Sequence, residues 1–142
     1  MANPFVHIEL NTADVGPAKA FYRKMFDWKL KDEKMGPGMT YTMLDAGKEP
    51  GGGMQKKPMA ESPNMWLPYV QVDDVKKSIA KAEKNGAKIL VPYMEIGPNG
   101  SLGIFLDPAG AALGVWAQAA KPAKAAKSAP AKKPAASAKK KK

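Results

Sequence analysis

The sequence predicts an α+β protein made of two βαβββ modules, and three observations support this prediction. Apolar and polar residues alternate over Phe5–Leu10, which is typical of a strand with one buried face. Apolar residues then recur at helical spacing between Val15 and Phe26. The same order of elements returns about 60 residues later, which indicates an internal duplication.

The first module is expected over residues 4–58. Its first strand has one apolar and one polar face, formed respectively by Val6, Ile8 and Leu10 and by His7, Glu9 and Asn11. Asp14 is a suitable N-cap for a helix over Val15–Phe26. The apolar stripe of this helix consists of Ala18, Phe21, Tyr22, Met25 and Phe26. Two alternating segments, at residues 28–34 and 39–47, predict strands, and the glycine-rich residues 48–55 predict a bend with at most a short strand.

The second module is expected over residues 65–118, after a linker at residues 59–64. A strand over residues 66–72 leads to Asp74, which repeats the capping position of Asp14. The following helix presents Val75, Ile79 and Ala82 on one face, and Gly86 ends it. A strand through residue 90 follows, so the order of elements matches that of the first module.

The composition changes at the end of this folded domain, which we place at residues 1–120. The net charge is +10, yet nine of the 23 lysine and arginine residues lie in residues 121–142, which contain no acidic residue. That segment is almost entirely Lys, Ala, Pro and Ser, so it buries too little apolar surface to offset the entropy of ordering. The sequence therefore predicts a disordered basic tail over residues 121–142.

The tail suggests one alternative function, because lysines neutralise phosphates without reading a base sequence. Non-specific nucleic-acid binding would involve Lys132, Lys133, Lys139, Lys140, Lys141 and Lys142.

Other classes of protein are excluded or disfavoured by the composition. The absence of cysteine excludes disulfides and cysteine-ligated metals. No secretory signal is visible, and no apolar run approaches the roughly 20 residues of a membrane span. A cytoplasmic protein is therefore expected.

Three segments carry a resemblance to a known family: Val6–Trp28, Tyr69–Leu90 and Gly103–Trp116. They resemble the vicinal oxygen chelate superfamily of glyoxalases, extradiol dioxygenases and bleomycin resistance proteins, and within it a glyoxalase-related branch of unassigned activity. The marks are the Asp-x6-Phe-Tyr spacing that begins at Asp14 and the Phe-x-Asp-Pro-x-Gly ending at Gly110. The resemblance implies that the two modules form a curled mixed sheet, or cup, of about eight strands. Helices would lie outside the cup, a ligand would bind inside, and the protein would form a homodimer.

The resemblance also places His7 at the first metal-ligand position of the family. The other family positions fall on Leu67 and Gly114, which supply no ligand, and near Gln55, which is the one donor there. Since catalytic metal sites need about three protein ligands, no cofactor is expected. The alternative is a divalent metal held by His7 and Glu9, in a lyase or dioxygenase-type enzyme.

The interior of the cup supplies the candidate site residues. The residues expected to bind the ligand are His7, Glu9, Tyr69, Gln71, Trp116 and Met54. Further candidates for the lining are Trp66, Tyr41, Phe105, Met39, Met43 and Met94. Glu9 is the candidate catalytic base, because partial burial raises the pKa of a carboxyl group. Pockets of this kind are mostly apolar with a few polar groups, so the first expectation is a protein that binds a small organic molecule.

Overall fold

A computed structural model describes residues 2–119 of the chain. The predictions of disorder and polyanion binding for residues 121–142 lie outside this range. The described part divides into two compact units, with the boundary between Val70 and Gln71. None of its helices is long and apolar enough to cross a membrane.

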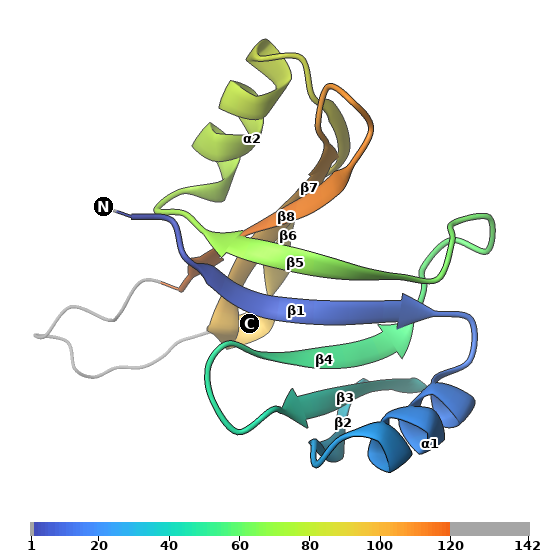
Figure 1. Cartoon of the computed structure of the whole chain (residues 1–142). Coiled ribbons are helices and arrows are strands. Elements are labelled where there is room, and N and C mark those ends of the chain that lie inside the picture. The colour runs from blue at the N-terminus through green and yellow to red at the C-terminus, as the bar shows by residue number, and fades with distance from the viewer. Residues whose placement is uncertain (1, 120–142) are drawn as a thin grey trace, which may run out of the picture. The chain divides into compact units, whose positions relative to one another are not determined.

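The first unit is a mixed sheet with one helix (Figure 1). Its strands lie in the order β2-β3-β4-β1-β5. The elements are β1 (Phe5–Thr12), α1 (Val15–Met25), β2 (Lys29–Gly36), β3 (Met39–Asp45), β4 (Gly51–Lys56) and β5 (Met65–Gln71). β1 pairs in parallel with β4 and antiparallel with β5, so it has a neighbour on each side. Because β5 pairs with β1, most of this strand belongs to the first unit and not to the second.

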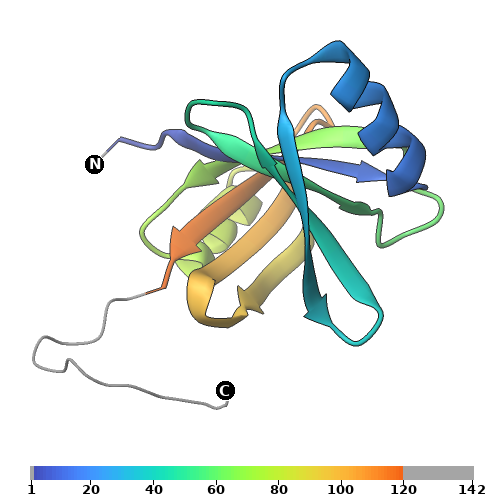
Figure 2. The same ribbon diagram turned by 90° about the horizontal axis from the view of Figure 1, so that it is seen from below.

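The second unit contains α2 (Val75–Lys84), β6 (Lys88–Ile96), a short 3-10 helix (Gly97–Asn99), β7 (Gly100–Leu106) and β8 (Ala112–Gln118). Two antiparallel pairings place its strands in the order β8-β7-β6. The β2–β3 hairpin of the first unit and the β6–β7 hairpin of the second can each be followed by colour in Figure 2. The eight strands and two helices confirm the predicted α+β class.

Both predicted helix caps are present. The Asp14 carboxylate accepts a hydrogen bond from the backbone N–H of Gly16 at 3.1 Å, and Asp74 accepts one from Lys77 at 3.0 Å. A capping side chain of this kind satisfies one of the N–H groups that the first turn of a helix leaves unpaired. The repeated cap therefore performs the same task in both halves of the chain.

Each helix covers a small apolar core of its own unit. In the first unit, Leu10, Leu44 and Met54 form the buried cluster, and Val15, Ala18, Tyr22, Trp28, Leu30 and Trp66 pack against it. In the second unit, the cluster consists of Val75, Ile79, Val115 and Ala117, with Val72, Ile89 and Phe105 around it. The predicted stripe of α1 is wider than the part that meets the sheet, because Phe21, Met25 and Phe26 stay about half exposed.

The glycine-rich segment forms a bend over residues 47–50, and a short strand follows it, as the sequence allowed. Residues 51–56 are β4, which lies between β1 and β3 in the sheet. A Cβ atom added at Gly52 would lie only 2.0 Å from the carbonyl oxygen of Ile8, so the neighbouring backbone leaves no room for a side chain. Sequence reasoning reads glycine as a strand breaker, whereas here glycine permits the close approach of two strands.

Candidate ligand-binding site

The polar face of β1 places a buried carboxylate at the centre of the first unit. The Glu9 side chain is 7% exposed, and it lies on the face of β1 that is opposite the α1 core, as the alternation predicted. Three neutral groups donate hydrogen bonds to it. Tyr41 Oη lies 3.0 Å from Oε2, Tyr69 Oη lies 3.0 Å from Oε1, and Asn11 Nδ2 lies 3.2 Å from Oε1.

The hydrogen bonds continue from this carboxylate in two directions along the sheet. On one side His7 Nε2 lies 2.7 Å from Tyr41 Oη. On the other side Gln55 Nε2 donates to Asn11 Oδ1 at 2.9 Å. We call this connected set the Glu9 network, and its members are His7, Glu9, Asn11, Tyr41, Gln55 and Tyr69. All six residues belong to the first unit.

The strand register explains why these side chains meet. His7 is the neighbour of Tyr69 across the β1–β5 pair, and Asn11 is the neighbour of Gln55 across the β1–β4 pair. Tyr41 reaches Glu9 from β3 by passing over Gly53 of the intervening strand β4. A Cβ atom on Gly53 would lie 2.2 Å from the phenol ring and its oxygen. Tyr41 therefore occupies the space that a side chain at position 53 would fill.

Burial and the nearby carboxylate shift the titration of the network. The pKa of Tyr41 and that of Tyr69 are both raised well above the ordinary value, first by burial and then by the negative charge of Glu9. Both phenols therefore keep their protons and remain donors. Burial lowers the pKa of His7, although Glu9 and Glu49 partly oppose this effect. The imidazole is accordingly neutral near pH 7.

A hollow of about 300 Å³ opens beside His7. We call it the His7 hollow, and it is lined by Val6, His7, Met43, Leu44, Asp45, Lys48, Glu49, Gly51 and Gly52. Its wall combines apolar side chains with one imidazole and three charged groups. This mixture is typical of a site for a small organic molecule. Glu9 does not line the hollow, so His7 is the member of the Glu9 network that a bound molecule would meet.

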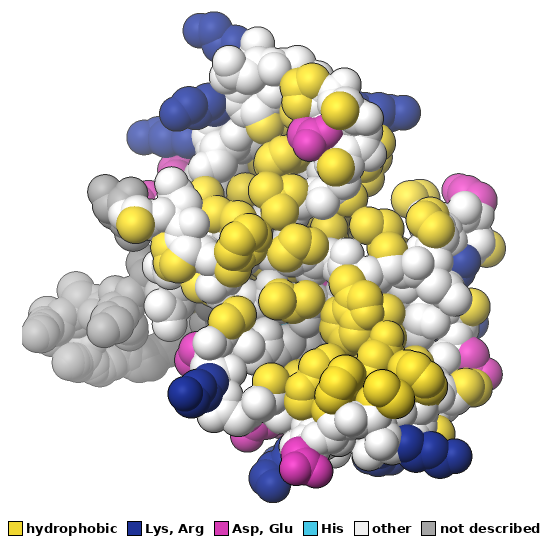
Figure 3. Space-filling view, in the orientation of Figure 1, with side chains coloured by type: hydrophobic (Ala, Val, Ile, Leu, Met, Phe, Trp, Pro, Cys, Tyr) yellow, Lys and Arg dark blue, Asp and Glu magenta, His cyan; other side chains and the backbone are white. Residues whose placement is uncertain are grey.

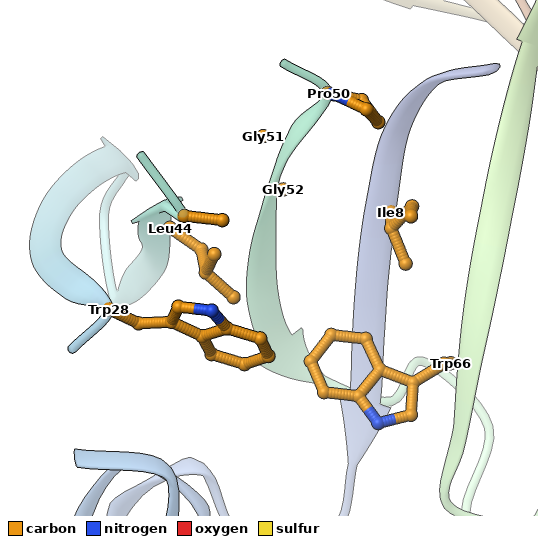
Figure 4. A pocket seen from close by; sticks show the side chains of 8 residues that line it. Ile8, Trp28, Leu44, Pro50, Gly51, Gly52 and Trp66 are labelled. Atoms are coloured by element: carbon orange, nitrogen blue, oxygen red, sulfur yellow. The ribbon is translucent and has the colours of Figure 1, made fainter. Parts of the chain in front are cut away.

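A second hollow, of about 270 Å³, is almost wholly apolar (Figure 4). We call it the tryptophan hollow, and it is lined by Ile8, Trp28, Leu44, Ala46, Pro50, Gly51, Gly52 and Trp66. The rings of Trp28 and Trp66 meet edge to face, with centroids 6.0 Å apart. Figure 3 shows hydrophobic side chains gathered at the surface on the side of the first unit that carries α1.

Within the first unit, the structure brings together three of the predicted ligand-binding residues. His7, Glu9 and Tyr69 are neighbours, as expected. Met54 is fully buried in the α1 core cluster, so its predicted place in the ligand lining is wrong. Trp116 lies in β8 of the second unit, between Val115 and Ala117, which face α2; Trp116 therefore points to the opposite face. Gln71 begins the second unit.

The wider lining list also needs correction. Trp66 packs beside Tyr22 of α1, and its indole N–H donates to the Tyr22 hydroxyl at 3.2 Å. Phe105 packs against the α2 core. Met43 lines the His7 hollow, whereas Met39 and Met94 are largely exposed. Tyr41 was expected only as general lining, and its bonds to both His7 and Glu9 make it the central residue that sequence reasoning undervalued.

Comparison with known proteins identifies the family to which this fold belongs. Residues 5–115 match the model of the glyoxalase/bleomycin resistance protein/dioxygenase superfamily. The chain belongs to this superfamily. Among solved structures, the chain resembles the hypothetical protein BH1468 from Bacillus halodurans, with a TM-score of 0.65, 15% identity, and coverage of 85% of this chain and 98% of that one. Methylmalonyl-CoA epimerase from Mycobacterium tuberculosis gives a TM-score of 0.61 at 14% identity, covering 82% and 88%. These likenesses show the superfamily fold.

Two curated proteins share more sequence with this chain. The protein named "Putative glyoxylase CFP32" from Mycobacterium tuberculosis is 32% identical over 113 residues, which are 77% of this chain and 43% of that protein. Anthracycline biosynthesis protein DnrV from Streptomyces peucetius is 25% identical over 125 residues, which are 76% and 44% of the two chains. This chain therefore spans less than half the length of the curated relatives that it matches.

Proposed function

We propose that this superfamily member binds a small organic molecule in the His7 hollow without using a metal ion to hold it. The observation that carries the proposal is the state of the Glu9 carboxylate. Both of its oxygens already accept hydrogen bonds from buried neutral donors, of which Tyr41 and Tyr69 are the closest. Such a carboxylate shapes and orients a polar site, and it does not need an ion to satisfy its lone pairs.

The donor set in the described residues fits a metal ion poorly. Within residues 2–119, no group of three or more His, Asp and Glu side chains is arranged so that it could hold a metal ion. His7 Nε2 and both Glu9 oxygens are occupied by bonds to tyrosine or asparagine. A metal held by His7 and Glu9 would have to break these bonds and would gain only two protein ligands. The same occupancy opposes direct base catalysis by Glu9, since a substrate would have to displace Tyr41 or Tyr69.

A ligand screen in the presence of a chelator tests the proposal. Small aromatic and polar compounds should raise the melting temperature of the protein, because a ligand that binds only the folded state stabilises it. The shift should disappear in His7→Ala and persist in Met39→Ala, whose exposed side chain lies outside the hollow. Elemental analysis of the untagged protein is the opposing measurement. Near-stoichiometric metal that His7→Ala removes would overturn the proposal in favour of a metal-dependent lyase or dioxygenase.

We also propose that a second copy of this chain covers the tryptophan hollow. Ile8 lies in that hollow and stays 36% exposed, although its strand β1 is paired on both sides. The curated relatives have more than twice the length of the matched region, which leaves room in each for another domain of this size. A second copy of this domain would bury the apolar surface that Ile8 leaves exposed in the tryptophan hollow.

Sedimentation measurements test this association. The protein should sediment as a dimer, and Ile8→Glu should shift it toward the monomer, because a buried unpaired charge is costly in an apolar interface. Met39→Glu is the matched control, since it adds the same charge at a strongly exposed methionine outside the hollow. A wild-type protein that is monomeric at high concentration would refute the proposal.

A further inference from the structure

We propose that the Glu9–Tyr41–His7 chain of hydrogen bonds holds the imidazole proton on Nε2, so that the His7 hollow selects ligands that donate a hydrogen bond to Nδ1. The inference deepens the proposed function and rests on it for the ligand class only. The assignment of the imidazole proton rests on the geometry of these hydrogen bonds.

The direction of the hydrogen bonds that join Glu9, Tyr41 and His7 follows from the donors and acceptors that each group has. An ionised carboxylate only accepts hydrogen bonds, so the Tyr41 hydroxyl proton points to Glu9 Oε2, 3.0 Å away. The Tyr41 hydroxyl has one proton, and it donates this proton to Glu9. At the second contact, 2.7 Å from His7 Nε2, the phenol oxygen must therefore accept. Nε2 carries the proton that is donated there.

The neutral state of the ring completes the assignment. Burial lowers the pKa of His7, and a neutral imidazole has one protonated and one unprotonated nitrogen. With the proton on Nε2, the nitrogen that remains is Nδ1, and it carries a lone pair. His7 is one of the residues that line the hollow, so a ligand that reaches Nδ1 meets an acceptor. An N–H or O–H group is therefore favoured over a carboxylate or a carbonyl.

The charges around the hollow favour a protonated amine among such donors. Asp45 and Glu49 both line the hollow, whereas Lys48 is its single cationic group. Glu9 adds another negative charge behind His7, and its hydrogen-bond partners are neutral. Within the described residues, the one recorded salt bridge joins Lys19 to Asp32, so none neutralises Glu9. A ligand that is both cationic and a hydrogen-bond donor matches these features best.

The sole histidine of the chain makes the proton assignment directly measurable. Long-range nitrogen–proton NMR spectra of the labelled protein at neutral pH should show a protonated Nε2 with a slowly exchanging proton. Tyr41→Phe should remove the protection of that proton, because it deletes the acceptor. Tyr69→Phe is the matched variant, since it deletes a phenol that binds Glu9 but is not hydrogen-bonded to His7. A wild-type ring protonated on Nδ1 would overturn the inference without any variant having to fold.

Three probes that each carry one phenyl ring test the ligand class: benzylammonium, benzyltrimethylammonium and benzoate. Benzylammonium should shift the His7 Nδ1 resonance and bind roughly tenfold more tightly than benzyltrimethylammonium, which has the charge but no N–H to donate. Benzoate should bind weakest. Glu49→Gln should weaken benzylammonium binding, and Lys48→Gln should not.

The two proposals fail in different ways. Equal binding of all three probes would overturn the selectivity for donors while leaving a small-molecule site in place. A ring protonated on Nε2, combined with the absence of any probe or library compound that perturbs His7, would overturn the proposed function and the ligand class together. In that case only the assignment of the proton would stand.

Discussion

Gly53 and Tyr41 occupy a single space in the sheet: a Cβ atom on Gly53 would lie 2.2 Å from the Tyr41 hydroxyl oxygen. Tyr41 reaches Glu9 from two strands away because β4 has no side chain at this point. The buried carboxylate and the glycine are thus parts of one arrangement, and changes to either are expected to disturb the other.

Gly53→Ala should destabilise the fold and displace the Tyr41 ring. The added methyl group overlaps the phenol, and overpacking of this kind costs about 1–3 kcal/mol of unfolding free energy. Urea denaturation measures the loss, and the His7 ring resonances should shift because Tyr41 is their neighbour. Gly16→Ala is the control, since the nearest atom to its added Cβ lies 3.5 Å away. Equal stability of Gly53→Ala and wild type would contradict the close fit.

Tyr69→Phe should cost more stability than the same change at Tyr93. The Tyr69 hydroxyl bonds to a buried carboxylate, and such bonds to charged groups contribute about 1.5–3 kcal/mol. The Tyr93 hydroxyl lies 3.3 Å from the Glu95 carboxylate at an exposed site, so its loss should change the free energy of unfolding by less than about 0.5 kcal/mol. Chemical denaturation of both variants gives the comparison. Similar losses would show that burial of Glu9 adds nothing to the bond.

Acidification below neutral pH should destabilise the protein through His7. The folded pKa of His7 lies below its ordinary value of 6.5 because of burial. As the pH falls through 6.5, the unfolded chain takes up the proton first, so stability decreases until the folded pKa is passed. Above 6.5 the contribution is constant. Denaturation of wild type and His7→Gln between pH 5 and 8 isolates this contribution, and a wild type that gains stability on acidification relative to His7→Gln would reverse the sign.

Met54→Ala should be among the more damaging methionine substitutions in the first unit. Met54 is fully buried beside Leu10 and Leu44, and truncation of a buried methionine costs about 2–5 kcal/mol. Met39 is 62% exposed, so Met39→Ala should leave the unfolding free energy nearly unchanged. Thermal denaturation orders the two variants. Comparable melting temperatures would return Met54 to the ligand lining where the sequence placed it.

Local patterns predicted the elements and one face of the site. Alternation along residues 5–10 placed His7 and Glu9 together on the polar face of β1, and Asp14 and Asp74 marked both helix starts. The 60-residue offset then placed Tyr69, the counterpart of Glu9, inside the cup as well. These inferences succeeded because each depends on spacing within a few residues or on the constant offset between the two modules.

Contacts between distant strands were beyond such patterns. The Tyr41–Glu9 bond joins residues 32 apart and depends on the glycine of an intervening strand. Met54 follows three glycines, so no alternation indicated its face. Trp66 has the opposite parity to Tyr69 on β5, so it packs against the α1 core although its aromatic character suggested the lining.

The three glycines at the start of β4 also limit how this site can change over evolutionary time. A side chain at Gly51, Gly52 or Gly53 would meet Leu44, Ile8 or Tyr41 at 3.0 Å or less. Two of these positions, Gly51 and Gly52, line both hollows, yet the backbone of the neighbouring strands restricts a side chain at Gly51 and leaves no room for one at Gly52. New ligand preferences must therefore arise from substitutions on β1, on β3 or in residues 45–50, while the strand between β1 and β3 remains a fixed spacer.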